Sequence, residues 1–375
     1  MKPPVVILAG VRWDFLWQRH QTLATLFAGA GYPTVFVETT GLANPRLGGA
    51  TARKMISRVH RPPGGGARPH GGKNLTVYAP LTVPPTSKAF RWSNERFLVP
   101  RVLRDFRKTA GSRPVVVAYP PTRTTLALIS GLDPRLVLYD CSDDYEHFPG
   151  VPEDIAQTER ELLLRADLVS CTSRRLLEKA RLLRPDAFLS GPAVDYERFA
   201  VLQSQSPARE VRTVCFFGDA TRHRIDFDVL GAIARAGFEL RLVGGLDGVG
   251  RRFLKMPRVD YWGDVSHAEL PRALAGVDAF VLPYRVNALT QAISPAKTYE
   301  CLAAGRPVVA APLPAMEELG RHVYLAERPQ DYVRTLRSLW DTGTEGRVRA
   351  GIERAGKNSW DARFGELEEA LWRAL

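Results

Sequence analysis

The sequence has little cysteine and no long apolar run. Its four cysteines, Cys141, Cys171, Cys215 and Cys301, are spread over 375 residues, and no pair has the short spacing of a metal site or a disulfide scaffold. We therefore expect free thiols, buried because three of them lie in or beside apolar runs. No run approaches the ~18 to 20 apolar residues of a spanning helix. The start also lacks a cleavable secretion signal, so we expect a cytoplasmic protein.

Two common phosphate-binding signatures are also missing. The turn after the first apolar run, residues 9–14, contains no Gly-x-Gly-x-x-Gly, and the glycines of 244–250 have other offsets. A Walker A sequence is absent as well. A dehydrogenase or a kinase is therefore disfavoured.

Positive charge is concentrated in one stretch of the chain. Against a formal net charge of +12 for the whole sequence, residues 40–113 contain 15 Lys and Arg and two acids, which gives +13 for this stretch and −1 for the rest. So concentrated a field predicts an anionic partner. We expect contacts with an anionic membrane surface or another anionic partner at Arg53, Lys54, Arg58 and Arg61, since basic residues near an anionic leaflet each contribute ~1 kcal/mol of attraction.

Short β-branched runs alternate with helical patterns throughout the chain. The first series of runs covers residues 5–9, 34–37, 75–78, 115–118, 136–139 and 168–171. The second covers residues 211–217, 238–243, 259–262, 279–282 and 307–310. This alternation is typical of parallel sheets covered by helices. We predict an α/β protein with two Rossmann-like parallel-sheet domains facing a central cleft.

The domain boundaries are predicted from composition. The polar stretch 203–207 favours a linker between a first domain, residues 1–202, and a second domain, residues 208–345. Residues 346–375 are expected to form helices that pack back toward the first domain. The last of these repeats apolar residues every three or four positions, at Trp360, Phe364, Leu367, Leu371 and Leu375. It is expected to brace both domains.

Three loops in the second half have the chemistry of a diphosphate site. Ligands of open parallel sheets bind at the carboxyl ends of the strands, and each loop follows a predicted strand or starts a predicted helix. Backbone N–H groups, arginines and a lysine are suited to phosphate oxygens. The candidate residues are Gly218, Arg222 and Arg224 in the first loop, Gly244 in the second, and Ser294, Lys297 and Glu300 in the third. Ser294 is expected to cap a helix there, and the alternative is an ordinary capped helix with a surface Lys–Glu pair.

An acidic loop in the first half is the candidate source of a catalytic base. Residues 139–148 follow a predicted strand and contain three aspartates, a glutamate and a histidine. Crowded carboxylates can have raised pKa values and act as general bases, and we single out Asp143 and Asp144, with Asp144 slightly ahead because it is further along the loop. No metal-ligand spacing is recognisable. The alternative is a solvated acidic loop.

Several motifs resemble those of two-domain nucleotide-sugar glycosyltransferases of the GT-B fold, specifically bacterial cell-surface polysaccharide enzymes. The matching stretches are residues 17–21, 139–144, 166–173, 191–199 and 295–309. The first is similar to Trp-Gln-Arg-Pro-Gln, with His20 in place of the proline. The second resembles Tyr-Asp-x-x-Asp-Asp, and the last, which is the most specific, resembles Pro-x-Lys-x-x-Glu followed by Gly-x-Pro-Val-Val.

The resemblance implies roles for individual residues. Glu300 would contact the donor ribose, Lys297 and the region of Arg222 the diphosphate, and Gly218 would let the backbone approach it. Many retaining members carry a second Glu eight positions before the ribose-binding one, where this sequence has Ala292. Stereochemistry therefore stays open, and an inverting reaction would need a base such as Asp143 or Asp144.

The predicted activity is transfer of a sugar from a nucleoside-diphosphate sugar to a hydroxyl of a glycan or polyprenyl-diphosphate-linked acceptor. No cofactor or metal is expected, because oriented donors can stabilise a diphosphate leaving group without one. The expected location is the inner face of the plasma membrane, as a peripheral protein, with no nucleic-acid partner. The alternatives are a basic nucleic-acid-binding protein and a sugar-nucleotide epimerase on the same fold.

Overall fold

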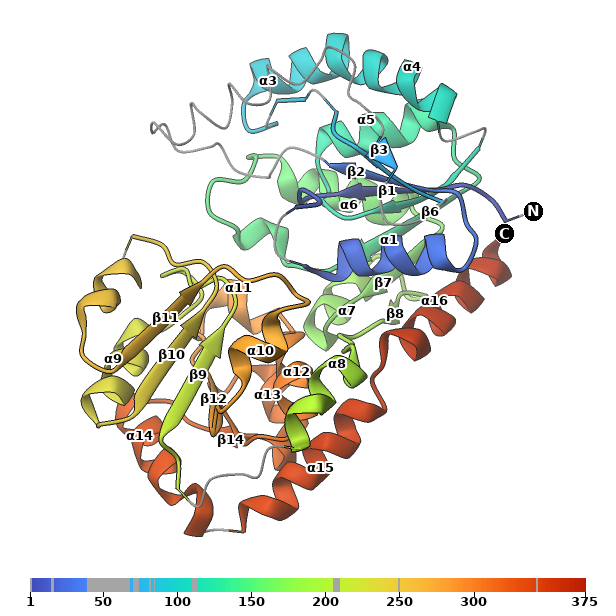
Figure 1. Ribbon diagram of the computed structural model, residues 1–375. Coiled ribbons are helices and arrows are strands. Elements are labelled where there is room, and N and C mark those ends of the chain that lie inside the picture. Colours follow the sequence, from blue (N-terminus) through green and yellow to red (C-terminus); the bar gives the residue numbers. More distant parts are fainter. Residues whose placement is uncertain are drawn as a thin grey trace. The chain divides into compact units, whose positions relative to one another are not determined.

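The computed structural model describes two compact units of the chain. The described residues are 2–14, 17–38, 68–69, 74–80, 82–83, 85–109, 113–204, 210–248, 250–341 and 343–375. One unit comprises Met1–Ser190 with Glu366–Leu375, and the other Gly191–Gly365 (Figure 1). The predicted contacts Arg53, Lys54, Arg58 and Arg61 lie outside the described residues.

The sheet of the first unit has the strand order β3-β4-β2-β1-β5-β6-β7-β8. All neighbours pair in parallel except β3 with β4. The strands are β1 (Val5–Ala9), β2 (Thr34–Glu38), β3 (Arg68–Pro69), β4 (Leu75–Tyr78), β5 (Val115–Ala118), β6 (Leu136–Cys141), β7 (Leu168–Cys171) and β8 (Phe188–Leu189). Every residue of β1 is buried, because helices cover both faces of such a sheet.

Three helices of the first unit, α3, α5 and α7, begin at hydroxyl side chains. Ser87, Thr122 and Ser173 accept hydrogen bonds from the backbone N–H groups of Phe90, Thr125 and Leu176, respectively, which satisfies a donor that the first turn leaves open. The helices are α1 (Arg19–Gly29), α3 (Lys88–Ser93), the π-helical turn η1 (Asn94–Leu98), α4 (Val99–Thr109), α5 (Arg123–Leu132), η2 (Tyr145–His147), α6 (Ile155–Arg165) and α7 (Arg174–Arg181). Helix α1 lies on one face of the sheet and α4 and α5 on the other (Figure 1).

The second unit contains a wholly parallel sheet with the order β11-β10-β9-β12-β13-β14. Its strands are β9 (Thr213–Phe217), β10 (Glu239–Val243), β11 (Val259–Gly263), β12 (Ala279–Leu282), β13 (Val308–Ala310) and β14 (Tyr324–Leu325). The chain reverses its direction across the sheet between β9 and β12. That reversal is a topological switch point, and ligands of such sheets bind beside it.

The helices of the second unit surround this sheet. They are α8 (Tyr196–Ala200), η3 (Val201–Ser204), α9 (Phe227–Arg235), η4 (Gly250–Lys255), α10 (Leu270–Leu274), α11 (Ala288–Gln291), α12 (Lys297–Ala303), α13 (Pro314–Leu319), η5 (Gly320–His322), α14 (Pro329–Ser338), η6 (Leu339–Asp341) and α15 (Thr344–Gly356). The last helix, α16 (Trp360–Ala374), begins in this unit, and its residues from Glu366 on belong to the first unit. The predicted α/β class with two Rossmann-like parallel sheets is confirmed.

The boundary between the units lies earlier than the polar stretch at 203–207. Phe199 and Leu202 belong to the apolar core of the second unit, and the Leu202 carbonyl accepts a hydrogen bond from Arg306 at 3.2 Å. At the other end, Glu368 of α16 accepts from Lys2 and from the Tyr32 hydroxyl, each at 2.7 Å. These contacts place the last residues of the chain in the first unit. All four cysteines are buried and free, as predicted.

Candidate active site

Two glycine turns lie side by side in the second unit, where β9 and β10 end. Gly218 and Gly244 have φ values of +108° and +116°, which only glycine adopts readily. A Cβ atom on Gly244 would lie 2.5 Å from the carbonyl oxygen of Gly218. One on Gly218 would lie 2.3 Å from Nζ of Lys297. The structure thus brings together three residues that the sequence analysis selected from separate loops.

Lys297 lies among aromatic rings beside these turns. Its Nζ is 4.8 Å from the ring centroid of Phe216 and 5.9 Å from those of Phe217 and Tyr284. Such contacts favour the ammonium charge without using its three N–H donors. Within the described part of the chain, Lys297 donates no hydrogen bond. Its donors therefore remain for a ligand at the glycine turns.

Asp219, which the sequence analysis missed, follows Gly218 directly. Burial raises the pKa of this carboxyl group, and the nearby Asp264 and Asp247 act in the same direction, against Arg224 and Lys297. The sequence could have pointed to Asp219, because it lies in the same loop after a strand as Gly218. Its protonation bears on how much negative charge a diphosphate would meet there.

The two arginines of this loop differ in position. Arg224 is half-buried and close enough to Asp219 to lower the pKa of its carboxyl group. The side chain of Arg222 is exposed, and its backbone N–H donates to Asp247 at 2.7 Å. Arg224 is therefore grouped with Lys297 by the structure, whereas Arg222 contributes a surface charge.

The predicted cap of the third loop is wrong. Helix α12 begins at Lys297 with Ala296 as its cap residue, and no side chain caps it. Pro295 and Ala296 instead accept from the backbone N–H groups of Thr298 and Tyr299, at 3.1 and 3.0 Å. Ser294 precedes this turn, so its hydroxyl is too early in the chain to cap the helix.

Glu300 has a partner that the sequence analysis did not select. Its Oε1 lies 3.5 Å from Nε2 of His267, and both side chains are about four-fifths buried, at 18% and 21% exposed. His267 packs edge-to-face on Phe199, with ring centroids 5.9 Å apart. The residue follows β11, so the rule that ligand groups follow strands would have found it. Its ring holds the Glu300 carboxylate on one side.

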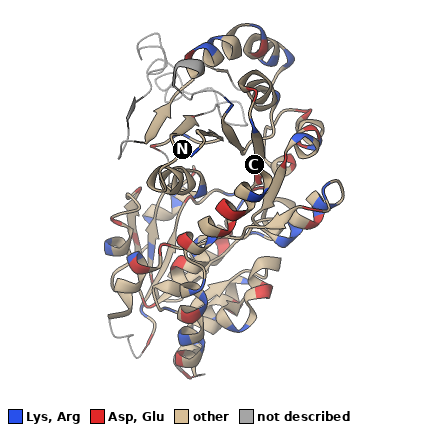
Figure 2. Ribbon diagram, turned by 90° about the vertical axis from the view of Figure 1, so that its right-hand side faces the viewer, with Lys and Arg blue, Asp and Glu red and all other residues tan. Residues whose placement is uncertain are grey.

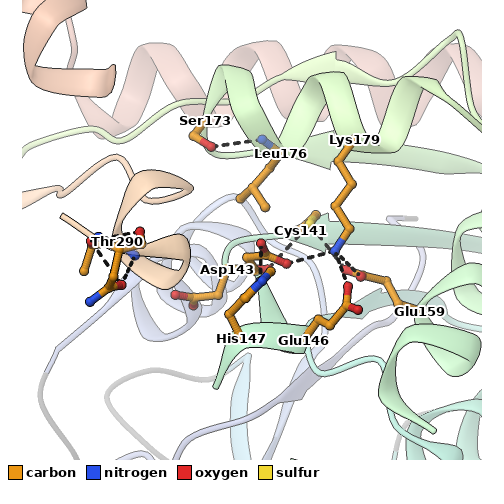
Figure 3. Close-up of polar contacts among 11 residues, drawn as sticks. Cys141, Asp143, Glu146, His147, Glu159, Ser173, Leu176, Lys179 and Thr290 are labelled. Carbon is orange, nitrogen blue, oxygen red and sulfur yellow. Dashed lines mark hydrogen bonds and ion pairs between the residues drawn. The ribbon is translucent and has the colours of Figure 1, made fainter. Parts of the chain in front are cut away.

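The acidic loop of the first unit holds a dense ionic network (Figure 3). One oxygen of Asp144 accepts from Nζ of Lys179 and the other contacts Nδ1 of His147, both at 2.8 Å. Lys179 also contacts Glu159 at 3.1 Å and Glu146 at 3.5 Å. Burial disfavours its charge, but the carboxylates of Glu159 and Asp144 outweigh burial and raise the pKa of Lys179.

The two candidate bases are therefore not equivalent. Asp144 is buried with both carboxylate oxygens engaged, whereas Asp143 is only half-buried. Figure 3 shows the Asp143 side chain turned away from Lys179. A carboxylate with a partner on each oxygen is a poor proton acceptor, because a proton on either oxygen would have to displace one partner. The geometry favours Asp143, the reverse of the order expected from position in the loop.

Two sequence motifs of the first unit meet in a buried ion pair. Nε of Arg19 donates to Asp140 at 2.6 Å, and its Nη2 donates to Ser190 at 2.8 Å. Ser170 donates to the same carboxylate at 2.7 Å. Burial alone would raise the pKa of Asp140, but Arg19 outweighs it and lowers that pKa. The sequence analysis named neither Arg19 nor Asp140 as a site residue, although the motifs at residues 17–21 and 139–144 contain them.

His20 lies beside this pair, in the first turn of α1. Its ring centroid is 3.8 Å from that of Tyr119, and its Nδ1 is buried without a hydrogen bond. Burial is the main cause that lowers the pKa of His20 to about 4. The histidine is therefore neutral at physiological pH.

The described residues provide neither a metal cluster nor a membrane-spanning helix. They contain no group of three or more His, Cys, Asp or Glu side chains placed to hold a metal ion. None of the helices in this part of the chain combines the length and apolar character needed to cross a bilayer.

Comparison with protein families identifies the second unit. Residues 211–342 match the model described as Glycosyl transferases group 1. A curated relative is the putative teichuronic acid biosynthesis glycosyltransferase TuaH of Bacillus subtilis (strain 168), 25% identical over 225 residues. That match covers 52% of this chain and 56% of TuaH, so the chain spans little more than half of that relative's length. The resemblance to nucleotide-sugar glycosyltransferases stated from the motifs is confirmed for residues 211–342.

Solved structures with the same fold cover the whole chain. Sucrose-phosphate synthase from Thermosynechococcus elongatus aligns over 100% of both chains with a TM-score of 0.69 and 17% identity. Anabaena HepE in complex with UDP-glucose aligns over 98% of this chain and 99% of its own, with a TM-score of 0.67 and 14% identity. At these identities the likeness concerns the fold, which is GT-B.

Proposed function

We propose that this chain, which has the GT-B fold and carries a group 1 glycosyl transferase domain at residues 211–342, transfers a sugar from a nucleoside-diphosphate sugar to a hydroxyl group. The single observation that carries the proposal is the position of Lys297 over the adjoining Gly218 and Gly244 turns. These turns lie at the carboxyl ends of β9 and β10, beside the switch point of the sheet. HepE, which has the same fold, binds UDP-glucose.

The donor would bind to the second unit. Lys297, with Arg224 and the backbone at Gly218 and Gly244, is assigned to the diphosphate, and Glu300 to the ribose hydroxyls. Positive φ at both glycines leaves room for the diphosphate to approach the backbone, which any Cβ would obstruct. Arg222 and Ser294 were assigned to the same donor, but the observed geometry gives them weaker support.

The chemical step is a displacement at the anomeric carbon of the donor sugar. The acceptor oxygen forms a bond to that carbon while the bond to the diphosphate oxygen breaks, and the acceptor proton passes to a base. We assign the base to Asp143 in the first unit, with Asp144 as the alternative. Lys297 stabilises the negative charge that develops on the leaving diphosphate, so the proposed reaction uses no metal and no cofactor.

The acceptor is proposed to bind to the first unit. A glycan or a polyprenyl-diphosphate-linked glycan fits the relation to TuaH, whose printed name assigns it to teichuronic acid biosynthesis. The net charge of +13 over residues 40–113, which include Arg53, Lys54, Arg58 and Arg61, supports attachment to an anionic membrane surface. The proposed location is accordingly the cytoplasmic face of the plasma membrane. The proposed role is synthesis of a cell-surface polysaccharide.

Donor binding is the direct test of this proposal. Thermal unfolding is measured with UDP-, GDP-, dTDP- and ADP-sugars, because a ligand of the native state raises the Tm. We expect one nucleotide class to raise the Tm of the wild-type chain, and to raise that of Lys297→Met by less at the same concentration. If no nucleotide sugar raises the Tm of the wild-type chain at concentrations that saturate other glycosyltransferases, the proposal is wrong.

A further inference from the structure

One helical run of the first unit exposes aromatic side chains that its own packing does not use. The run comprises α3, η1 and α4, residues 88–109. Within it Phe90, Trp92 and Phe97 are 42%, 60% and 57% exposed. Isolated apolar residues on a surface are ordinary, but three exposed aromatic rings within eight residues are a concentration that indicates an interaction surface.

The opposite side of the same run is already packed. Val99, Val102 and Phe106 of α4 are buried, and the ring of Phe106 lies 5.0 Å from that of Tyr78. Asn94 is fully buried and exchanges hydrogen bonds with the backbone of Val83 at 2.9 and 2.7 Å. The run is thus anchored to the unit without Phe90, Trp92 and Phe97. These three rings remain available for an external surface.

A π-helical turn brings two of the rings together. In η1 the backbone N–H of Val99 donates to the carbonyl of Asn94, five residues earlier. In a regular α-helix, residues five apart point about 140° away from each other. The wider turn instead places Trp92 and Phe97 with ring centroids 5.3 Å apart, edge to face. Such turns occur often at functional sites.

Positive charge surrounds these rings. Lys88, Arg96, Arg101 and Arg104 are exposed, and the exposed acid of the run is Glu95. None of the four cations forms an ion pair with another described residue. Figure 2 shows Lys and Arg positions along these uppermost helices. The combined surface, which we call the aromatic–basic face, consists of Phe90, Trp92, Phe97, Lys88, Arg96, Arg101 and Arg104.

We infer that the aromatic–basic face docks on an anionic lipid bilayer. Tryptophan and phenylalanine settle at the boundary between headgroups and acyl chains, and arginine and lysine pair with anionic headgroups. The run lies on the outside of the sheet and is fixed by its buried face, so it can rest in the plane of the interface without unfolding. A charged surface without the rings would suit many polyanions, whereas rings and cations on one helical run suit a lipid surface.

Docking itself does not depend on the proposed function. Its biological purpose does rest on that function, since docking would bring the first unit to a lipid-linked acceptor. It also adds a surface to the contacts proposed at Arg53, Lys54, Arg58 and Arg61. The two parts can fail separately, because vesicle binding and sugar transfer are measured in different assays.

The first experiment measures co-sedimentation of the full chain with vesicles. One set contains phosphatidylglycerol and phosphatidylcholine, and the other phosphatidylcholine alone. We expect binding to the anionic vesicles, and we expect Trp92→Ala/Phe97→Ala to weaken it by at least about tenfold. Arg96→Gln/Arg104→Gln should weaken it by about fivefold for each side chain.

Matched controls remove similar groups elsewhere. Tyr261→Ala removes a ring that is 39% exposed in β11 of the second unit, and Arg252→Gln/Lys255→Gln removes two exposed cations of η4. Both controls should bind vesicles as the wild-type chain does. Equal losses in the controls and in the variants of the aromatic–basic face would overturn the inference.

The second experiment reports insertion directly. All four native cysteines are buried, so an exposed cysteine introduced by Ala89→Cys can be labelled alone with a polarity-sensitive nitrobenzoxadiazole dye. Addition of anionic vesicles should raise and blue-shift its emission, whereas Tyr261→Cys should stay unchanged. No spectral change at position 89 while the chain sediments with vesicles would show that another surface binds the lipid.

Two further outcomes separate the inference from its rivals. If Trp92→Ala/Phe97→Ala raises the KM for a soluble glycan acceptor and leaves vesicle binding intact, the face binds sugar and the inference is overturned. If vesicle binding behaves as expected but no nucleotide sugar binds, the docking inference is supported and the proposed transfer reaction is wrong.

Discussion

Two lysines, one in each unit, stand in opposite chemical situations. Lys179 of the first unit has Asp144, Glu159 and Glu146 around its ammonium. Lys297 of the second unit has ring faces around its ammonium and no hydrogen-bond acceptor among the described residues. Both are partly buried cations near strand ends. The ammonium of Lys179 is paired within the protein, whereas that of Lys297 has Asp219 nearby but forms no ion pair or hydrogen bond with a described residue.

The difference separates structural charge from charge kept for a ligand. A buried charge is costly unless it is paired, so the charges of the Lys179 cluster satisfy one another and have little left to offer a substrate. A cation held only by aromatic rings beside glycine turns keeps its donors free for an anion. The same distinction applies to the buried Arg19–Asp140 pair, which is satisfied on both sides.

The largest expected effect comes from breaking that pair. Asp140→Asn leaves the Arg19 charge buried without its counter-ion, and loss of one partner of a buried pair costs about 3–5 kcal/mol. Urea unfolding followed by circular dichroism should show this decrease in the free energy of unfolding. The control is Asp186→Asn, whose carboxylate pairs with Arg184 at the surface and should change stability by less than about 1 kcal/mol. Equal stability of Asp140→Asn and the wild-type chain would show that the pair contributes nothing net.

The second effect concerns His20, which lies beside the same pair. Its pKa is about 4 in the folded chain against 6.5 for an ordinary histidine, so between these values the unfolded state binds a proton that the folded state does not. Stability due to His20 is therefore complete above pH 6.5 and falls as the pH drops toward 4, by ~3 kcal/mol at most.

Urea unfolding between pH 7 and pH 4 measures this dependence. His20→Phe should flatten the profile in this window. The control is His223→Phe, which removes an exposed histidine and should leave the profile as steep as that of the wild-type chain. A profile of His20→Phe that is as steep as the wild-type one would contradict the assignment.

The sequence predicts much of the fold because the strands are buried on both faces. The runs at 5–9, 115–118 and 279–282 coincide with β1, β5 and β12. The strands β3, β8 and β14 have two residues each, which is too short for any periodic pattern to register. The π-helical turn η1 also could not be predicted from the spacing of apolar residues. These elements depend on tertiary packing.

The residues of the candidate site likewise fall into those that a local sequence pattern predicts and those that only tertiary packing reveals. Gly218, Gly244 and Lys297 could be selected because each stands directly after a strand or at the start of a helix. The pairing of Arg19 with Asp140 links residues 121 positions apart, and that of His267 with Glu300 crosses between loops. No local pattern contains such a contact. The cap at Ser294 failed for a related reason, since Pro295 and Ala296 form a turn whose carbonyl groups accept the first helical N–H groups.

The next effect in size tests the two lysines against each other. Lys297→Met should weaken donor binding about 10- to 100-fold, the usual loss for one charge-assisted hydrogen-bond donor, and should hardly change stability. Lys179→Met should do the reverse, because it leaves Asp144 and Glu159 buried without their cation. Isothermal titration with the nucleotide sugar and urea unfolding are measured on both variants. If both variants lose affinity and stability alike, the distinction between the two clusters is wrong.

The smallest effect concerns the glycine turns. Gly218→Ala places a Cβ within 2.3 Å of Lys297 Nζ in a backbone with φ of +108°, so it should lower donor affinity as well as stability. Gly237→Ala is a matched control, because Gly237 has φ of +101° and nothing within 4 Å of an added Cβ. Both substitutions carry the strain of positive φ, about 1–2 kcal/mol, and only the first displaces the lysine. Equal donor affinity of the two variants would mean that Lys297 binds the diphosphate from elsewhere or does not bind it.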